Sequence, residues 1–161
     1  MLDDQRAAME NGTLPLFKSS DGRYIIPVIG KGLWGDIWGY VALKDDLNTI
    51  SGVVFDHKGE TPGLGAEIAS ATFCKQFEGE KIFEGSELVS IAVIKGGAPK
   101  DDLHAVDAVS GGTMTSRGLE SMLKDCLKLY EPFLKSHIEA AAAPATAEPE
   151  VFNNENTEDN D

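Results

Sequence analysis

Hydroxyl-bearing residues and a pair of glycines gather where the last helix of the chain is predicted to begin. The stretch SGGTMTS holds four hydroxyls, on Ser110, Thr113, Thr115 and Ser116. One such side chain is enough to cap a helix by accepting a hydrogen bond from a free backbone N–H group. Gly111 and Gly112 permit positive φ and close approach of an anion, and first-turn N–H groups point at such a ligand. The stretch therefore predicts either a capped turn or a phosphate site.

A second glycine-containing stretch, GKGLWG at 30–35, matches the pattern G-x-G-x-x-G. In a dinucleotide site a helix follows these glycines at once and its N-terminus meets the pyrophosphate. Here the alternating, strand-like DIWGYVAL follows, so the dinucleotide interpretation fails. The glycines instead let the backbone turn tightly beside a flat, bulky group. Trp34 lies within this turn and is a candidate to lie against an aromatic ligand.

A third stretch, GETPGLG at 59–65, precedes a predicted helix. It is either a plain connection or a loop whose backbone approaches a planar group closely, because Gly63 and Gly65 carry no side chain. Catalytic groups are scarce, since the three histidines His57, His104 and His137 are scattered along the chain. The sequence therefore predicts no catalytic set and no metal site.

Hydrophobic periodicity predicts the elements that position these loops. Strands are expected over 24–29, 36–43, 49–57 and 87–94, with Ile37, Gly39, Val41 and Leu43 on one face of the second. A helix of about 12 to 14 residues is expected to place Ala66, Ala69, Phe73 and Phe77 on one stripe. The last helix is expected over 117–135, with this apolar face: Leu119, Met122, Leu123, Cys126, Leu129, Tyr130 and Phe133.

The order of these elements predicts an α+β domain with a mostly antiparallel sheet flanked by helices. Three segments are expected: an N-terminal extension over 1–16, the domain over 17–136, and a disordered acidic tail over 137–161. The tail lacks periodicity, is rich in Ala and Pro, and has seven carboxylates but no Lys or Arg.

The composition excludes several classes of function. The 161 residues carry a net charge of −13, which argues against nucleic acid and against anionic membranes as partners. No apolar run approaches the length of a membrane span, and no signal peptide opens the sequence. The two cysteines, Cys74 and Cys126, are expected to be small buried hydrophobes, and a disulfide between them stays open.

Taken together, three stretches resemble one family. GKGLWGDIWGYVAL, ETPGLGAEI and KGGAPKDDLHAVDAVSGGTMTSRGLESML are similar, in order and spacing, to the covalent-FMN domain of the C-subunit of the sodium-translocating NADH:quinone oxidoreductase. The resemblance covers roughly residues 14–136. The family's flavinylation motif, Asp-x-x-Ser/Thr-Gly-Ala-Thr, falls on residues 107–113, with Gly112 in the place of the usual Ala.

The resemblance implies a phosphodiester between Thr113 and FMN. It also implies that the phosphate is held by Ser110, Gly111, Gly112, Thr115 and Ser116. The isoalloxazine would be framed by Trp34 and the following loop residues: Glu60, Thr61, Gly63, Leu64 and Gly65. Lys95 would meet the phosphate or the flavin rim, and Asp107 would serve either maturation or loop geometry.

Members of this family pass electrons inside a membrane complex that oxidises NADH, reduces quinone and pumps sodium. The resemblance implies the other subunits as partners, a flavin transferase during maturation, and a position on the periplasmic side of the inner membrane. Family members have an N-terminal membrane helix, which we do not expect within these 161 residues, and the domain alone is not expected to oxidise NADH.

Two alternatives remain open. The G-subunit of the Rnf electron-transport complex shares the same flavin domain, although GKGLWG and ETPGLG favour the sodium pump. In the other alternative, a non-redox binding or scaffolding module, SGGTMTS would be only a helix cap.

Overall fold

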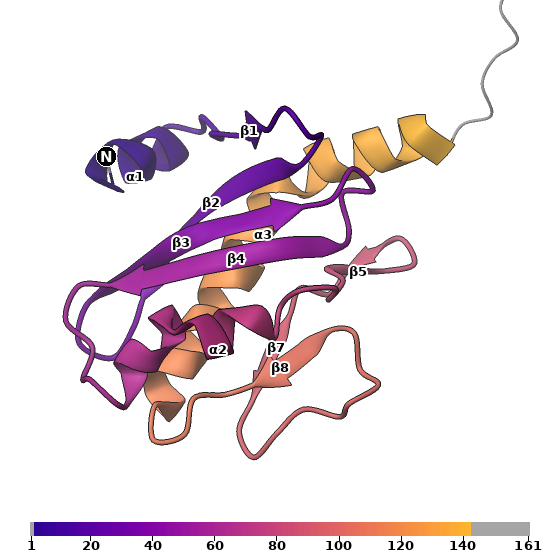
Figure 1. Cartoon of the computed structure of the whole chain (residues 1–161). Helices are drawn as coiled ribbons and strands as arrows, with labels where there is room; N and C mark the ends of the chain where they lie inside the picture. The colour runs from indigo at the N-terminus through magenta and orange to yellow at the C-terminus, as the bar shows by residue number, and fades with distance from the viewer. Residues whose placement is uncertain (1, 143–161) are drawn as a thin grey trace, which may run out of the picture.

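A four-stranded antiparallel sheet forms the centre of the computed structural model, which describes residues 2–142 (Figure 1). Its strands are β1 (Phe17–Lys18), β2 (Tyr24–Lys31), β3 (Asp36–Leu43) and β4 (Ile50–His57), in the order β1-β2-β3-β4. The three longer strands confirm the predicted ones. In β3 buried residues alternate with half-buried ones, and the buried set is Ile37, Gly39, Val41 and Leu43, as the alternation predicted.

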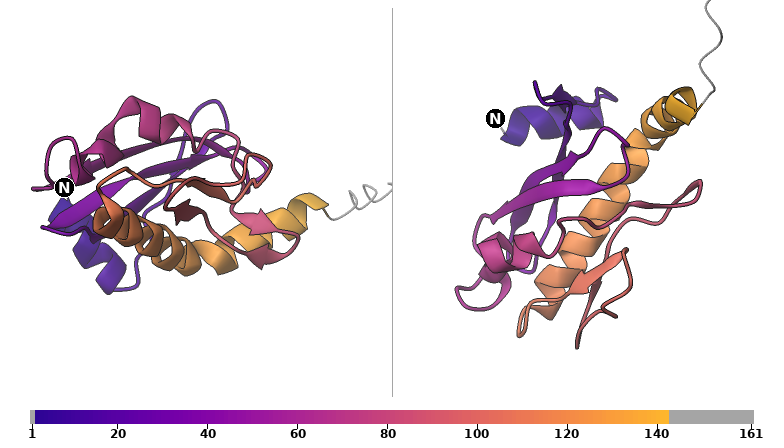
Figure 2. Two further views of the ribbon diagram at one scale, coloured as in Figure 1. Left: turned by 90° about the horizontal axis from the view of Figure 1, so that it is seen from below. Right: turned by 45° about the vertical axis from the view of Figure 1, so that its right-hand side comes forward.

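The long helix α3 (Thr113–Ala142) packs across one face of this sheet, mainly against β2 (Figure 2). The approach is close, because a Cβ atom on Gly30 would lie 2.6 Å from Cβ of Met122. A Cβ atom on Gly118 would fall inside van der Waals contact of the Lys31 carbonyl oxygen. Glycine is therefore required on both elements at this crossing.

The helix is longer than predicted at both ends. It starts at Thr113, within SGGTMTS, and it continues to Ala142, past residue 137 where the tail was expected to begin. The alanines at 140–142 are strong helix formers, which explains the extension. One position of its predicted apolar face is wrong, since Leu129 is 48% exposed while Leu127 and Leu134 are buried. The rest of the predicted tail, 143–161, lies outside the described residues.

The helix predicted to begin near Ala66 is two short pieces. A 3-10 turn, η1 (Gly65–Ala69), is followed by α2 (Ala71–Lys75), and the Ser70 hydroxyl caps α2 by accepting from the Phe73 N–H. The apolar stripe is nevertheless used, because Phe77 packs edge-on against Phe73 and against Phe55 of β4, and Phe73 lies tilted against Phe55. Burial of these rings stabilises the segment without a regular helix.

The predicted strand over 87–94 is broken in two. Glu87–Leu88 forms β6, which pairs with β5 (Phe83–Glu84), and Ala92–Ile94 forms β7. The break falls at Ser90, which has a φ of 60°. β7 then pairs in parallel with β8 (Ala105–Asp107), a pairing that the sequence analysis did not predict. The α+β class with a mostly antiparallel sheet is confirmed.

The N-terminal extension contains α1 (Leu2–Glu10), which lies beside the β2 edge of the sheet (Figures 1 and 2). It is attached by Arg6, which pairs with Asp36 at 3.0 Å, and by Gln5, which donates to the Tyr40 hydroxyl at 3.0 Å. Within the described residues, no helix is long and apolar enough to cross a membrane. Cys74 and Cys126 are free thiols.

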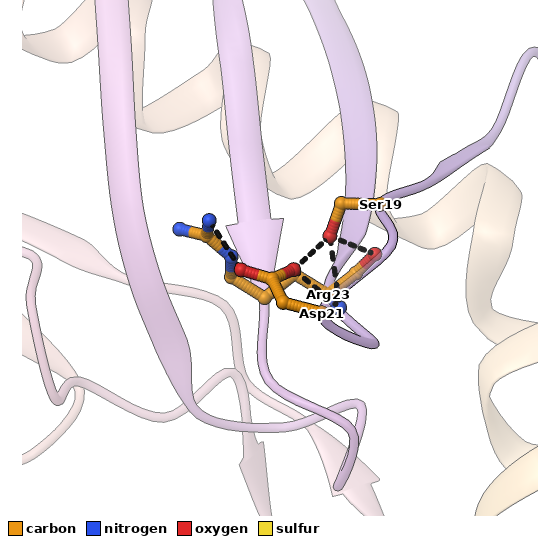
Figure 3. A network of polar contacts seen from close by, with 3 residues as sticks. All are labelled: Ser19, Asp21 and Arg23. Carbon is orange, nitrogen blue, oxygen red and sulfur yellow. Dashed lines mark hydrogen bonds and ion pairs between the residues drawn. The ribbon is translucent and has the colours of Figure 1, made fainter.

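The turn between β1 and β2 carries a local polar network (Figure 3). The Ser19 hydroxyl donates to the Asp21 carboxylate, and Arg23 forms an ion pair with Asp21 at 2.6 Å. The hydrogen bond from Arg23, with that from Ser19, holds the pKa of Asp21 well below its usual value. This network links residues at most four positions apart, and the charged side chains are half exposed.

Candidate functional site

Three loops that are distant in the sequence meet at the end of the sheet where α3 begins (Figure 1). They are the β2–β3 turn, the segment between β4 and η1, and the stretch that leads from β8 into α3. Together they line a hollow of about 300 Å³. Its wall includes the predicted residues Trp34, Glu60, Thr61, Leu64, Gly65, Gly111, Gly112, Thr113 and Thr115. Residues of two separately predicted loops and of the helix start are thus brought together.

Glycines let two of these loops pack backbone to backbone. A Cβ atom on Gly112 would lie 3.2 Å from the backbone of Gly65, so the loops touch through their main chains. Gly111 has a φ of 74° and lies against the Leu64 side chain, where an added Cβ atom would be 2.6 Å from Cδ2. The structure therefore gives these glycines a packing role. Gly63, in contrast, has a φ of 75° and open space around it.

Glu60 lies between the loops and is only 4% exposed. Its Oε1 accepts a hydrogen bond from the Trp34 N–H at 2.9 Å, and its Oε2 accepts one from the Thr115 hydroxyl at 2.5 Å. Burial by itself would raise the pKa of Glu60. The hydrogen bonds from Thr115 and from the backbone N–H groups of Trp34, Leu33 and Gly35 outweigh it and lower that pKa. Both oxygens therefore accept hydrogen bonds from inside the protein, and the expected place of Glu60 beside the flavin stays a prediction.

The four hydroxyls of SGGTMTS fall into two classes. Thr115 and Ser116 are each 1% exposed, and the Ser116 hydroxyl accepts from the Val109 N–H at 3.1 Å. Both side chains lie on the inner face of the helix, which packs into the core, so their expected contact with a phosphate stays a prediction that their burial does not favour. Ser110 is exposed and Thr113 half-buried, and both residues line a hollow at the surface.

Thr113 also lines a second, more polar hollow of about 460 Å³, together with Lys95, Ser110 and Gly111. The Asp107 carboxylate accepts a hydrogen bond from the Ala98 N–H at 2.7 Å and so fastens the turn that carries Lys95. Of the two roles expected for Asp107, this contact supports loop geometry. Lys95 is thereby placed in one hollow with Thr113, as a phosphate contact requires.

Large apolar side chains are unusually exposed around the first hollow. Trp34 is 69% exposed, Met114 53%, Leu33 50% and Leu64 43%. Exposed apolar groups clustered at a concave site indicate a ligand or partner that covers them. Sequence reasoning missed Leu33 and Met114, although each directly precedes or follows a residue that it had selected.

Within residues 2–142, no group of three or more His, Cys, Asp or Glu side chains could hold a metal ion. The arrangement offers instead a helix N-terminus with free N–H groups, the half-buried Thr113 and a lysine. Beside them lies the apolar rim. Such a site suits a ligand that has a phosphate at one end and a flat apolar body at the other.

Comparison with known proteins agrees with this chemistry. Residues 32–128 match the FMN-binding domain family. The C-subunit of the Na(+)-translocating NADH-quinone reductase from Vibrio anguillarum is 43% identical over 111 residues, which are 68% of this chain and 44% of that protein. Its counterpart from Neisseria meningitidis serogroup A is 43% identical over 108 residues, covering 65% and 42%. The chain thus spans less than half the length of these two curated relatives.

Two solved structures share the fold. The crystal structure of the same C-subunit from Parabacteroides distasonis superposes with a TM-score of 0.75 and 45% identity, covering 80% of this chain and 66% of that one. NqrC from Shewanella oneidensis gives a TM-score of 0.67 and 36% identity, with 76% and 61% covered.

Proposed function

The chain belongs to the FMN-binding domain family, and from this premise we propose that it carries FMN bonded through a phosphodiester to Thr113. In this proposal it is an electron-carrying part of the C-subunit of a sodium-translocating NADH:quinone oxidoreductase. The curated relatives described above bear that subunit's name, which favours it over the Rnf-type alternative. The flavin would supply the redox chemistry, and the protein would supply position and electrostatics.

The residues at the site fit FMN. Thr113 lies on the boundary between the two hollows, so a group attached to its hydroxyl has a polar side and an apolar side available. Lys95 and the first-turn N–H groups of α3 would neutralise the phosphate. Trp34, Leu33, Leu64 and Met114 would cover the ring system, and their present exposure would fall on binding.

The choice among hydroxyls carries the proposal. Of the four in SGGTMTS, those of Thr115 and Ser116 are buried and hydrogen-bonded inside the protein. Ser110 lies before the helix, while Thr113 is its first residue. Thr113 is therefore the hydroxyl-bearing residue that lines both hollows and lies at the N–H groups of the first turn.

Partners and location follow from the same proposal. The chain would work with the other subunits of the membrane complex and would meet a flavin transferase during maturation. We propose the periplasmic side for the domain, as the family resemblance implies.

Intact mass after co-expression with the flavin transferase tests the proposal. The expected gain is the mass of FMN less one water, mapped to residue 113 within the 101–124 peptide. Thr113→Val, which keeps the shape but loses the hydroxyl, is expected to abolish the gain. Thr113→Ser keeps a hydroxyl and is expected to retain it. A wild-type chain without flavin, or a flavin on Ser110, would contradict the proposal.

A further inference from the structure

Glu60 differs from the other carboxylates of the chain in its surroundings. Within residues 2–142 only four polar residues are buried, namely Glu60, Ser90, Thr115 and Ser116, and Glu60 alone among them carries a charge. A buried carboxylate normally pairs with a cation, because an isolated charge is costly to remove from water. The described residues contain no ion-pair partner for Glu60. Backbone N–H groups and one hydroxyl compensate its charge instead.

The contacts of Glu60 join parts of the chain that are far apart in the sequence. Trp34 is 26 residues before Glu60 and Thr115 is 55 residues after it. The backbone of Glu60 is fixed as well, since its N–H donates to Nδ1 of His57 at 3.0 Å. The carboxylate therefore ties the Trp34 turn to the first turn of α3.

The fold reserves room for this carboxylate. A Cβ atom on Gly32 would lie 2.8 Å from the Cδ atom of Glu60, and one on Gly65 would lie 2.8 Å from Oε2. Both positions must stay glycine for the carboxylate to reach its donors. Such a shell of backbone around one charged group is typical of a positioning residue.

We infer that Glu60 is the positioning residue of the flavin site and that its buried negative charge lowers the reduction potential of a flavin held there. This inference rests on the function proposed above. The clamp fixes the backbone of Trp34 in the wall of the hollow. The negative charge of Glu60, which no cation of the described residues neutralises, lies in the same wall and opposes the arrival of electrons. Both effects come from one side chain that does not need to touch the flavin.

Two variants separate the clamp from the charge. Glu60→Gln keeps an oxygen to accept from the Trp34 N–H and gains an NH₂ group that donates to the Thr115 hydroxyl oxygen, so it retains the geometry without the charge. Glu60→Ala removes both. Glu67→Gln is the matched control, because Glu67 is an exposed carboxylate in the neighbouring turn η1.

The clamp is measured on the flavin-free protein by hydrogen exchange at the Trp34 N–H. Protection is expected in the wild type, in Glu60→Gln and in Glu67→Gln, with a loss of at least tenfold in Glu60→Ala. Equal protection in Glu60→Ala and the wild type would overturn the clamp. This arm does not depend on whether the chain carries flavin.

The charge is measured as the midpoint potential of the flavinylated protein. Glu60→Gln is expected to raise the ratio of reduced to oxidised flavin at a fixed potential at least tenfold, about 30 mV for a two-electron couple. Glu67→Gln is expected to leave that ratio within twofold of the wild type. An unchanged potential in Glu60→Gln would overturn the role of the charge while leaving the flavin on Thr113 intact. A wild-type chain without flavin would instead contradict the function proposed above.

Discussion

Two carboxylates, Asp21 and Glu60, have pKa values lowered by hydrogen bonds, yet they do different work. Asp21 lies in the β1–β2 turn, half exposed, and bonds to Ser19 and Arg23 (Figure 3). Glu60 is buried and joins Trp34 to Thr115. The first network closes a turn that the local sequence already favours. The second joins separate loops. Hydrogen bonds to a carboxylate therefore contribute more to the fold when the group is buried and its partners are far apart in the sequence.

Loss of the Glu60 side chain is expected to lower the stability of the protein more than any other change in these two networks. Glu60→Ala leaves the partly buried Trp34 N–H and the buried Thr115 hydroxyl without their acceptors, and it opens a cavity. We expect the free energy of unfolding to fall by about 3 kcal/mol in urea denaturation followed by circular dichroism. Glu67→Ala serves as the exposed control. A decrease in the free energy of unfolding below about 1 kcal/mol would mean that the buried Glu60 network stabilises the protein no more than the exposed β1–β2 turn does.

Crowding the Glu60 network is expected to have the next largest effect. Gly65→Ala places a Cβ atom 2.8 Å from Oε2 of Glu60 and inside contact distance of the Thr115 hydroxyl. Overpacking of this kind costs about 2 kcal/mol, measurable in the same urea titration. Gly59→Ala is the matched control in the same loop, because nothing lies within 4 Å of its added Cβ atom. Equal stability of the two variants would show that the side chains of Glu60 and Thr115 can shift to accommodate the added Cβ atom at little cost in free energy.

The pH dependence of stability tests what the charge of Glu60 contributes. A carboxylate whose folded pKa is lowered stabilises the protein above its unfolded pKa, and this stabilisation is lost as the pH falls through the folded value. For Glu60 the loss is expected to begin near the usual value of 4.5 and to continue below it. The stability difference between wild type and Glu60→Gln should therefore shrink from pH 6 to pH 3 in thermal melts. A constant difference in stability between the two proteins over this pH range would mean that the charge of Glu60 contributes nothing to folding.

The smallest effect is expected at the β1–β2 turn. Asp21→Asn keeps an oxygen to accept from Ser19, and solvent screens the lost ion pair with Arg23. We expect no measurable change in Tm at 0.15 M salt. A clear decrease in Tm would show that an exposed local network can matter as much as a buried one.

Period-two and period-3.6 patterns were enough to predict the central sheet and the long helix. They failed where short elements depend on distant partners. The parallel pairing of β7 with β8 involves three residues on each strand, too few to leave a periodic signal. The stretch near Ala66 has a helical stripe, but packing of Phe73 and Phe77 on Phe55 decides its shape. Local patterns do not show such long-range contacts.

The site was predictable in its location more than in the roles of its residues. Glycine and hydroxyl content marked the three loops, and the structure brings them together. The sequence did not reveal that Glu60 and Thr115 bond to each other, since 55 residues separate them. It also did not sort the buried hydroxyls from the more exposed ones, because the helix was expected to begin at residue 117 rather than 113. The role of Thr113 stays a prediction.

The crossing at Gly118 has a consequence for how this site can change over time. Here the helix touches the Lys31 carbonyl through main-chain atoms. The spacing between helix start and sheet is thus set by atomic radii and does not vary with the side chains chosen elsewhere in the interior. Substitutions among Leu, Ile and Met at neighbouring apolar positions therefore need not move the N-terminus of α3. The core of the domain can diversify while the geometry of the candidate site stays the same.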